Sequence, residues 1–250
     1  MNRAYWDDLA ATYDEQIFSV LRSDDRGVMA DHIARHADQG KTAADLGCGP
    51  GQITPLLAAQ FGAVHACDIS RGLLTQAREA CYENDNVEFY RHDLSQPVDP
   101  PFAPVDFAVC VNVILSADLE VRERMWNSIT ASVGMGGTLL LVLPSHESAL
   151  YANFRQLDWH VRTGLRGAEA MRRSATNESA VTQLEHGVRE IDGVGTKHYL
   201  REEIIVQLAD RGLHAEEFTK LTYDWETEFA NPPAWLGTPH PWNWLVLARR

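Results

Sequence analysis

The stretch Thr42-Ala-Ala-Asp-Leu-Gly-Cys-Gly-Pro-Gly-Gln-Ile-Thr54 decides the fold of this 250-residue chain. It begins with a short apolar run and continues with three glycines at alternate positions, Gly47, Gly49 and Gly51. A helix-like segment follows over residues 53–61. A strand, a tight glycine turn and a helix in this order let the backbone come close to a bound ligand. The stretch therefore predicts a ligand-binding turn at the end of a buried strand.

A second short apolar run, residues 63–67, ends in Asp68, which lies 21 residues after Gly47. An acidic residue at this distance can hold the two hydroxyls of a ribose. The spacing therefore predicts a nucleoside-containing cofactor. A plain strand-to-helix turn without a ligand is the alternative for a glycine triplet taken alone.

The spacing of the glycines separates the candidate cofactors. The dinucleotide fingerprint needs a sixth-position glycine, where this chain has Gln52, and its third glycine comes one residue early at Gly51. The P-loop pattern fails because no Gly-Lys-Ser/Thr follows. The pattern Asp45-x-Gly47-x-Gly49-x-Gly51 resembles motif I of class I S-adenosylmethionine-dependent methyltransferases. The acid is suited to accept a hydrogen bond from the cofactor's ammonium group.

Four further segments extend the resemblance: residues 5–14, 87–94, 105–114 and 134–144. In the family, the first is a helix that closes over the cofactor, and the fourth is a Gly-Gly turn with the fifth strand. The second and third end in residues that line the cofactor pocket, and the acid that matches Asp93 contacts the adenine amino group. The resemblance assigns S-adenosylmethionine as the cofactor and implies as its binding residues Tyr5, Tyr13, Asp45, Gly47, Cys48, Gly49, Gly51, Asp68, Ile69, Asp93, Leu94 and Asn112.

Helical and strand-like patterns alternate along the chain, which predicts an α/β fold with a parallel sheet and helices on both faces. We expect strands at residues 42–47, 63–68, 87–92, 105–111, 138–143, 217–225 and 244–249. We expect helices at residues 20–38, 52–60, 71–83, 118–132 and 201–211. The resemblance implies a Rossmann-like, seven-stranded, mostly parallel sheet with an antiparallel last strand. The length fits one domain, 1–250, with N-terminal cap helices at 1–40 and an insertion at 145–198 after the fifth strand.

The insertion, residues 145–198, lies at the carboxyl edge of the predicted sheet, where open α/β sheets bind ligands. An apolar residue recurs there at helical spacing: Leu150, Phe154, Leu157, Val161 and Leu165. We expect a helical lid over the acceptor pocket, because insertions at this edge add substrate selectivity. The alternative is a helix that packs on the core.

Arginines and aromatic residues accompany that helix. Arg155, Arg162 and Arg166 run along its edge and are candidates for binding an anionic acceptor such as a carboxylate. Solvated arginines at the rim of a packed helix are the alternative. A second aromatic cluster over residues 223–244 either walls the acceptor pocket or packs down as a proline-stiffened loop. The substrate-binding candidates are Arg155, Trp159, Arg162, His198, Trp225 and Trp235.

Methyl transfer from a sulfonium is a direct displacement, so alignment of the acceptor and exclusion of water carry most of the catalysis. A base is needed only where the acceptor must lose a proton. Five histidines fall in the predicted lid or top-edge loops: His146, His160, His186, His198 and His240. We choose His198 as the candidate base because Thr196-Lys197-His198-Tyr199 enters a helix at the pocket edge. The sequence leaves the catalytic residues otherwise unknown.

Composition narrows the acceptor and the partners. The net charge of −13 repels nucleic acid, and no Asn-Pro-Pro-Tyr motif follows the fourth strand, so we expect a small-molecule acceptor with an O or N nucleophile. The four cysteines form no C-x-x-C pair, so no metal site is expected, and Cys48 fits the loop as a small residue. No apolar run is long enough to cross a membrane and no signal peptide is recognisable. We expect a cytoplasmic monomer or homodimer without a membrane or nucleic-acid partner.

Three other functions stay open. The chain could bind S-adenosylmethionine without catalysis, or methylate a protein or RNA. An NAD-dependent oxidoreductase is disfavoured by Gln52 and by the lack of a recognisable Tyr-x-x-x-Lys pair.

Overall fold

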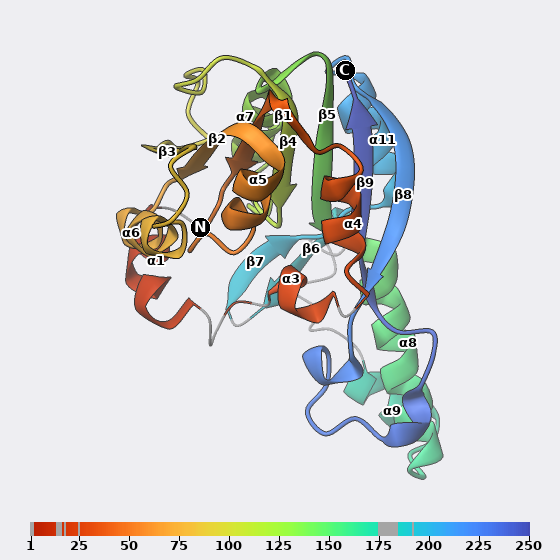
Figure 1. The fold of residues 1–250 in the computed structure, drawn as a ribbon. Coiled ribbons are helices and arrows are strands. Elements are labelled where there is room, and N and C mark those ends of the chain that lie inside the picture. Colours follow the sequence, from red (N-terminus) through yellow and green to blue (C-terminus); the bar gives the residue numbers. More distant parts are fainter. Residues whose placement is uncertain (1–2, 14–16, 18, 25, 175–184, 192) are drawn as a thin grey trace.

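The computed structural model describes residues 3–13, 17, 19–24, 26–174, 185–191 and 193–250. These residues form a seven-stranded sheet with helices on both faces, and a two-stranded hairpin lies at the carboxyl edge of that sheet (Figure 1). The strand order is β3-β2-β1-β4-β5-β9-β8. Strand β9 runs antiparallel to both β5 and β8, whereas the other neighbours in the sheet are parallel. The predicted fold class, including the antiparallel last strand, is confirmed.

The strands of the main sheet are β1 Asp38–Leu46, β2 Phe61–Asp68, β3 Val87–Arg91, β4 Val105–Val111, β5 Val133–Pro144, β8 His214–Thr222 and β9 Trp242–Arg249. The hairpin consists of β6 Val188–Ile191 and β7 Val194–Lys197. The helices before the insertion are α1 Arg3–Leu9, η1 Ala10–Thr12, α3 Val20–Ser23, α4 Val28–Ala34, α5 Thr54–Gln60, α6 Arg71–Ala80 and α7 Leu119–Ala131. The later helices are α8 His146–Arg162, α9 Gly167–Ser174, α11 Arg201–Ala209, η3 Trp225–Thr227 and η4 Ala234–Leu236.

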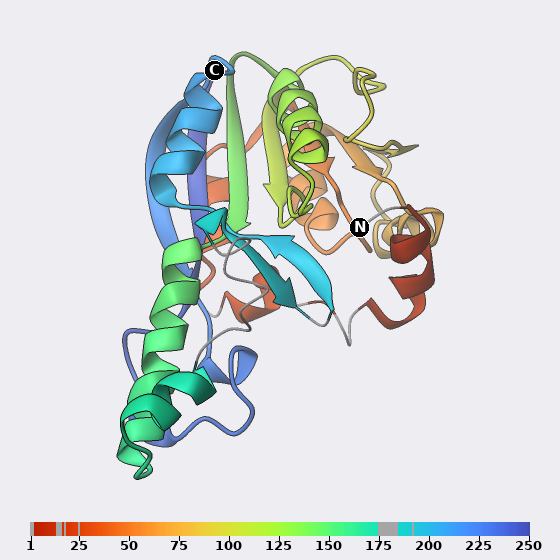
Figure 2. The ribbon, with the colours of Figure 1, turned by 180° about the vertical axis from the view of Figure 1, so that it is seen from behind.

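The central strands are apolar along most of their length because helices cover both faces. On one face, Met29 and Ile33 of α4 and Leu57 of α5 belong to a cluster with alternate residues of the central strands. On the other face, Trp126 of α7 and Ile204 of α11 complete the larger cluster. Figures 1 and 2 show these two helical layers from opposite sides. The sheet is therefore rigid, and its carboxyl edge is free to carry a site.

The N-terminal region differs from the single helix predicted over residues 20–38. Two short helices, α3 and α4, replace it, and Gly27 separates them with a φ of 65° that a helix cannot accommodate. The last residue of the predicted helix, Asp38, already belongs to β1. Of the described helices, none has the length and apolar content that a membrane crossing requires.

The insertion is only partly helical. Its α8 and α9 match the predicted helical character, but the β6–β7 hairpin was not predicted, and residues 175–184 of the predicted lid lie outside the described residues. The apolar stripe of α8 faces outward, with Leu150, Phe154 and Val161 45%, 60% and 51% exposed. The helix buries small and polar residues instead, and one of them, Ser148, accepts a hydrogen bond on its hydroxyl from the Trp242 amide at 2.7 Å. The amphipathic pattern predicted the helix but not the face that it packs.

Candidate active site

The glycine loop joins β1 to α5 at the carboxyl edge of the sheet. All three glycines have positive φ angles, 76° at Gly47, 55° at Gly49 and 84° at Gly51. The amides of Gly47 and Cys48 donate to the Cys67 carbonyl at 2.8 and 2.9 Å, which ties the loop to the end of β2. These left-handed conformations are available to glycine at little cost and are strained for other residues.

Close packing is a second reason for glycine in this loop. A Cβ atom on Gly47 would collide with the side chain of Val113, which follows β4. A Cβ atom on Gly51 would lie 2.8 Å from the Cα of Ala77 on α6. The loop thus brings bare backbone against β4 and α6, as a cofactor-binding turn requires.

Two buried carboxylates flank the loop. Asp68 accepts hydrogen bonds from the Gly49 amide at 3.0 Å and from the Ser70 amide at 2.8 Å. Asp45 accepts one from the Thr54 hydroxyl at 2.7 Å. Burial raises the pKa of Asp45 to about 7, and burial also raises the pKa of Asp68. Since each negative charge opposes ionisation of the other, a bound cation such as an ammonium group would stabilise both.

The acid after β3 is held differently. Asp93 accepts hydrogen bonds from the amide and hydroxyl of Ser95 at 2.9 and 2.6 Å and from the Gln96 side chain at 3.1 Å. Burial raises the pKa of Asp93, but these hydrogen bonds outweigh burial and the net pKa is lowered. Leu94 is buried in the core, and Ile69 lies at the end of β2 with its carbonyl accepting a hydrogen bond from Arg91. These predicted residues lie at the same edge of the sheet as the loop.

The N-terminal helix docks beside the glycine loop. The Asp7 carboxylate on α1 accepts hydrogen bonds from the Ser70 hydroxyl at 2.7 Å and from the amide that follows it at 2.8 Å. The Tyr13 hydroxyl lies 3.3 Å from the position that a Cβ on Gly49 would occupy. Tyr5 packs edge-on against the tryptophan next to it. Of the two predicted tyrosines, Tyr13 is the one placed against the loop.

The ends of β4 and β5 carry buried polar atoms that have no hydrogen-bond partner among the described residues. Asn112 follows β4 with a φ of 52°, and its Oδ1 atom is one of them. The Nδ1 atom of His146, the first residue of α8, is another. A buried polar group without a partner costs free energy, so such atoms mark a place where a polar ligand would bind favourably.

His198 lies between these two strand ends. Isolated bridges pair Thr196 with Ser116 after β4, and Tyr199 with Ser145 after β5. The Nδ1 atom of His198 lies 3.1 Å from the Thr196 carbonyl, which can only accept, so Nδ1 carries the proton and Nε2 carries the lone pair. Burial, followed by the charge of Arg189, lowers the pKa of His198 to about 4, and the imidazole is neutral at physiological pH.

The remaining substrate-binding candidates gather elsewhere, between α8 and the 225–240 loop. The Arg155 guanidinium is buried, donates to the Leu236 carbonyl at 2.6 Å and lies over the rings of Trp225 and Trp235. Arg162 lies 4.5 Å from the centre of the Trp235 ring. The structure therefore separates this group from His198, and its part in acceptor binding stays a prediction. The fifth member, Trp159, packs edge-on against Phe229.

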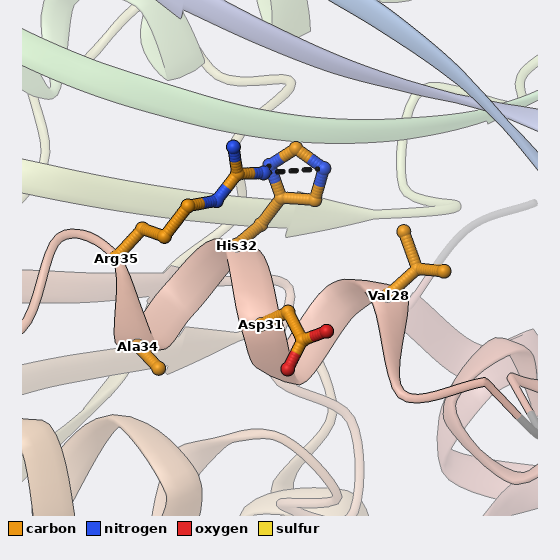
Figure 3. Close-up of a pocket in the computed structure, with 5 residues that line it drawn as sticks. All are labelled: Val28, Asp31, His32, Ala34 and Arg35. Carbon is orange, nitrogen blue, oxygen red and sulfur yellow. Dashed lines mark hydrogen bonds between the residues drawn. The ribbon is translucent and has the colours of Figure 1, made fainter.

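A surface hollow of about 540 Å³ lies along α4, lined by Val28, Asp31, His32, Ala34 and Arg35 (Figure 3). The Arg35 guanidinium approaches the His32 ring within it. None of its lining residues belongs to the glycine loop or to the ends of β4 and β5. The hollow is thus separate from the candidate active site.

Sequence reasoning missed Arg189 on β6, whose positive charge acts on both His146 and His198. Its hairpin has a signal, because Asp192-Gly193 between two short segments with β-branched residues is a preferred two-residue hairpin turn. Gly193 has the positive φ, 78°, that such a turn requires.

Residues 43–137 match the sequence model of a family described as "Methyltransferase domain". Comparison with curated proteins gave no match. A S-adenosylmethionine-dependent methyltransferase from Methanosarcina mazei aligns with a TM-score of 0.61 and 17% identity over 88% of this chain and 96% of its own. A putative methyltransferase from Haloferax volcanii, solved with the Trm112 activator, aligns with a TM-score of 0.60 and 17% identity over 98% and 96%. Magnesium protoporphyrin IX methyltransferase from Synechocystis, solved with its cofactor, aligns with a TM-score of 0.59 and 15% identity over 99% and 94%.

The glycine loop lies inside the matched segment. The strand order and the antiparallel β9 are those of the predicted fold. Residues 43–137 match a methyltransferase-domain model, and the chain has the same fold as the S-adenosylmethionine-dependent methyltransferases with which it aligns.

Proposed function

We propose that this protein is an enzyme that transfers a methyl group from S-adenosylmethionine to an O or N nucleophile of a small molecule. One observation carries the proposal: a glycine loop flanked by two buried carboxylates lies at the same sheet edge as two buried polar atoms, on Asn112 and His146, that no described residue hydrogen-bonds. The glycine loop and its two carboxylates suit a cofactor with an ammonium group and a ribose. The polar atoms of Asn112 and His146 suit a polar acceptor beside that cofactor.

The cofactor supplies a methyl group activated by a sulfonium. Asp45 would stabilise the ammonium group, and Asp68 would accept hydrogen bonds from the ribose hydroxyls. Asp93 would accept one from the adenine amino group, and Tyr13 would cover the loop. Because Asp45 and Asp68 are already oriented by hydrogen bonds from Thr54, Gly49 and Ser70, these residues bind without reorganisation.

The acceptor half would align the nucleophile and exclude water, which supplies up to about 7–11 kcal/mol of barrier reduction in favourable cases. In this proposal α8, α9 and the β6–β7 hairpin, which all lie within residues 145–198, form a lid over the acceptor. His198 would take the acceptor's proton on Nε2 where the acceptor is a hydroxyl or an ammonium.

Isothermal titration with S-adenosylhomocysteine, with NAD as the control ligand, tests cofactor binding. We expect micromolar affinity for the former and none for NAD. Transfer of labelled methyl from S-adenosylmethionine into the low-molecular-weight fraction of a metabolite extract tests the acceptor class. Label in the protein or RNA fraction would favour a macromolecular acceptor, and binding without any transfer would favour a non-catalytic protein. Absence of binding would refute the cofactor assignment.

A further inference from the structure

Arg189 lies on β6, opposite Thr196 of β7. The paired segment continues into His198, whose amide donates to the Gly187 carbonyl at 2.6 Å. The Nη2 atom of Arg189 lies 3.5 Å from the Oδ1 atom of Asn153, which is two helical turns after the start of α8. The guanidinium is therefore held between the hairpin and the first turns of α8. Figure 2 shows this hairpin beneath the carboxyl edge of the sheet.

Three other side chains lie around this guanidinium, and we call the four residues Arg189, His146, His198 and Tyr223 the Arg189 cluster. Burial lowers the pKa of both histidines, and the Arg189 charge contributes to the lowering in each. Burial raises the pKa of Tyr223, and so does the Glu228 carboxylate, which accepts a hydrogen bond from its hydroxyl at 2.8 Å; the Arg189 charge is a smaller, opposing effect. Backbone hydrogen bonds place the two histidines beside the hairpin, because the His146 amide donates to the Tyr199 carbonyl at 3.0 Å and the His198 amide donates to the Gly187 carbonyl. The three side chains come from α8, from the segment after β7 and from the segment after β8.

Arg189 has no carboxylate within ion-pair distance among the described residues, although acidic residues outnumber basic ones by 35 to 22 in the chain. Two other cations of the insertion are paired: Lys197 contacts Glu203 at 2.8 Å, and Arg162 contacts Asp158 at 3.0 Å. A partly buried guanidinium without a counter-ion is stabilised by an anion that reaches it.

The two histidines add uncharged hydrogen-bonding capacity beside that positive charge. Nδ1 of His146 is buried and has no partner among the described residues, and Nε2 of His198 carries a lone pair. The Oδ1 atom of Asn112 is a further buried acceptor at the same strand ends. A molecule with an anionic group and a nearby hydroxyl or amine would satisfy this combination of groups.

We propose that the Arg189 cluster binds an anionic group of the methyl acceptor, a carboxylate or a phosphate-type group, and that Arg189 is the residue that selects for it. The planar guanidinium forms two parallel hydrogen bonds to either group. This inference rests on the proposed function and moves anion recognition from the predicted arginines of α8 to the hairpin.

The test titrates the protein saturated with S-adenosylhomocysteine with two probes, glycolate and inorganic phosphate, at constant ionic strength. Ethylene glycol is the uncharged counterpart of glycolate. The variants are Arg189→Met, Arg189→Lys and the control Arg172→Met, which removes the same charge from an exposed position on α9 of the same insertion.

We expect Arg189→Met to weaken binding of the preferred probe by about 10- to 100-fold, with affinity for S-adenosylhomocysteine unchanged. Arg189→Lys keeps the charge without the fork and should fall between wild type and Arg189→Met. The preference between glycolate and phosphate distinguishes a carboxylate acceptor from a phosphate acceptor.

Equal affinity for ethylene glycol and glycolate, equal losses in Arg189→Met and Arg172→Met, or no probe binding by wild-type protein that binds S-adenosylhomocysteine would overturn the inference and leave the proposed function standing. Failure of wild type to bind S-adenosylhomocysteine would instead refute the proposed function. The retained affinity for S-adenosylhomocysteine also reports that each variant is folded.

Discussion

The glycine-loop half and the hairpin half of the site are built from different kinds of sequence. The first lies within residues 45–93 and uses backbone amides and three acids at or just beyond the ends of consecutive strands. The second draws on the ends of β4 and β5, the hairpin and the segment after β8, which are far apart in the chain. A ligand site built from a short local motif can be read from sequence, whereas one assembled by topology requires the structure.

The two halves also differ in how well their buried polar groups are satisfied. In the glycine-loop half, Asp45 and Asp68 already accept hydrogen bonds from the protein. In the hairpin half, Asn112 and His146 keep buried atoms without partners among the described residues, and Arg189 lacks a counter-ion there. The first half is thus preorganised, and in our proposal a ligand would complete the second.

In the glycine-loop half, we expect the largest effect from the substitution Gly51→Ala. The residue has a φ of 84°, and its Cβ would lie 2.8 Å from the backbone of Ala77. Strain and overpacking together should lower the free energy of unfolding by about 2–5 kcal/mol. Urea unfolding measures this loss, and titration with S-adenosylhomocysteine measures the accompanying loss of affinity.

The matched control for that test is Gly136→Ala, at a φ of 74° with open space around the Cβ. It should cost only the backbone strain, about 1–2 kcal/mol, and leave cofactor affinity unchanged. Equal losses in the two variants would show that contact with α6 does not constrain the glycine loop.

Asp68→Asn probes the charge of the same half without changing its shape. Loss of charge-assisted hydrogen bonds should weaken S-adenosylhomocysteine binding by about 10- to 100-fold. The control is Asp85→Asn, an exposed aspartate in the turn after α6, which should bind like wild type. Unchanged affinity in Asp68→Asn by isothermal titration would remove this residue from the ribose site.

The predictability of each half follows from these differences. Alternating apolar runs and the glycine spacing predicted the sheet and placed Asp45, Asp68 and Asp93 at its edge, because the first two lie within the last two residues of β1 and β2 and the third lies two residues after β3. The sequence pattern did not predict the hairpin, because its two strands are only four residues each. Arg189, the second residue of β6, was therefore not predicted as a site residue.

The face of α8 could not be read from its own pattern. Periodicity identifies an apolar stripe, but the packing partners decide which stripe is buried. Here α8 buries the small residue Ala152 against Trp225 and Leu236 and leaves Phe154 exposed. Arg155 lies in the same contact, where its hydrogen bond to the Leu236 carbonyl links α8 to the 225–240 loop.

Arg155→Met tests whether that group is structural. The variant loses the hydrogen bond to the Leu236 carbonyl and its stacking on Trp225, and we expect unfolding free energy to fall by about 1–3 kcal/mol. Arg162→Met, an exposed residue paired with Asp158, should change it by less than about 0.5 kcal/mol. Thermal or urea unfolding measures both, and a stable Arg155→Met that loses only acceptor binding would restore the sequence-based assignment.

The last test concerns the pH dependence of the glycine-loop half. The pKa of Asp45 is about 7 in the folded protein, raised by burial from 3.8. Between pH 4 and pH 7 the folded state therefore binds more protons at this residue than the unfolded state does, and its contribution to stability falls as pH rises through that window. Asp45→Asn should flatten this part of the curve of unfolding free energy against pH.

Cofactor binding should respond with the opposite sign. An ammonium group favours ionised Asp45, so affinity for S-adenosylhomocysteine should rise severalfold between pH 5 and pH 8, with a proton released on binding near pH 7. Calorimetry in two buffers of different ionisation enthalpy measures that proton. If Asp45→Asn releases the same fraction of a proton as wild type, the charge that the ligand senses comes from another group, and Asp68, whose pKa is also raised, would be the next carboxylate to replace.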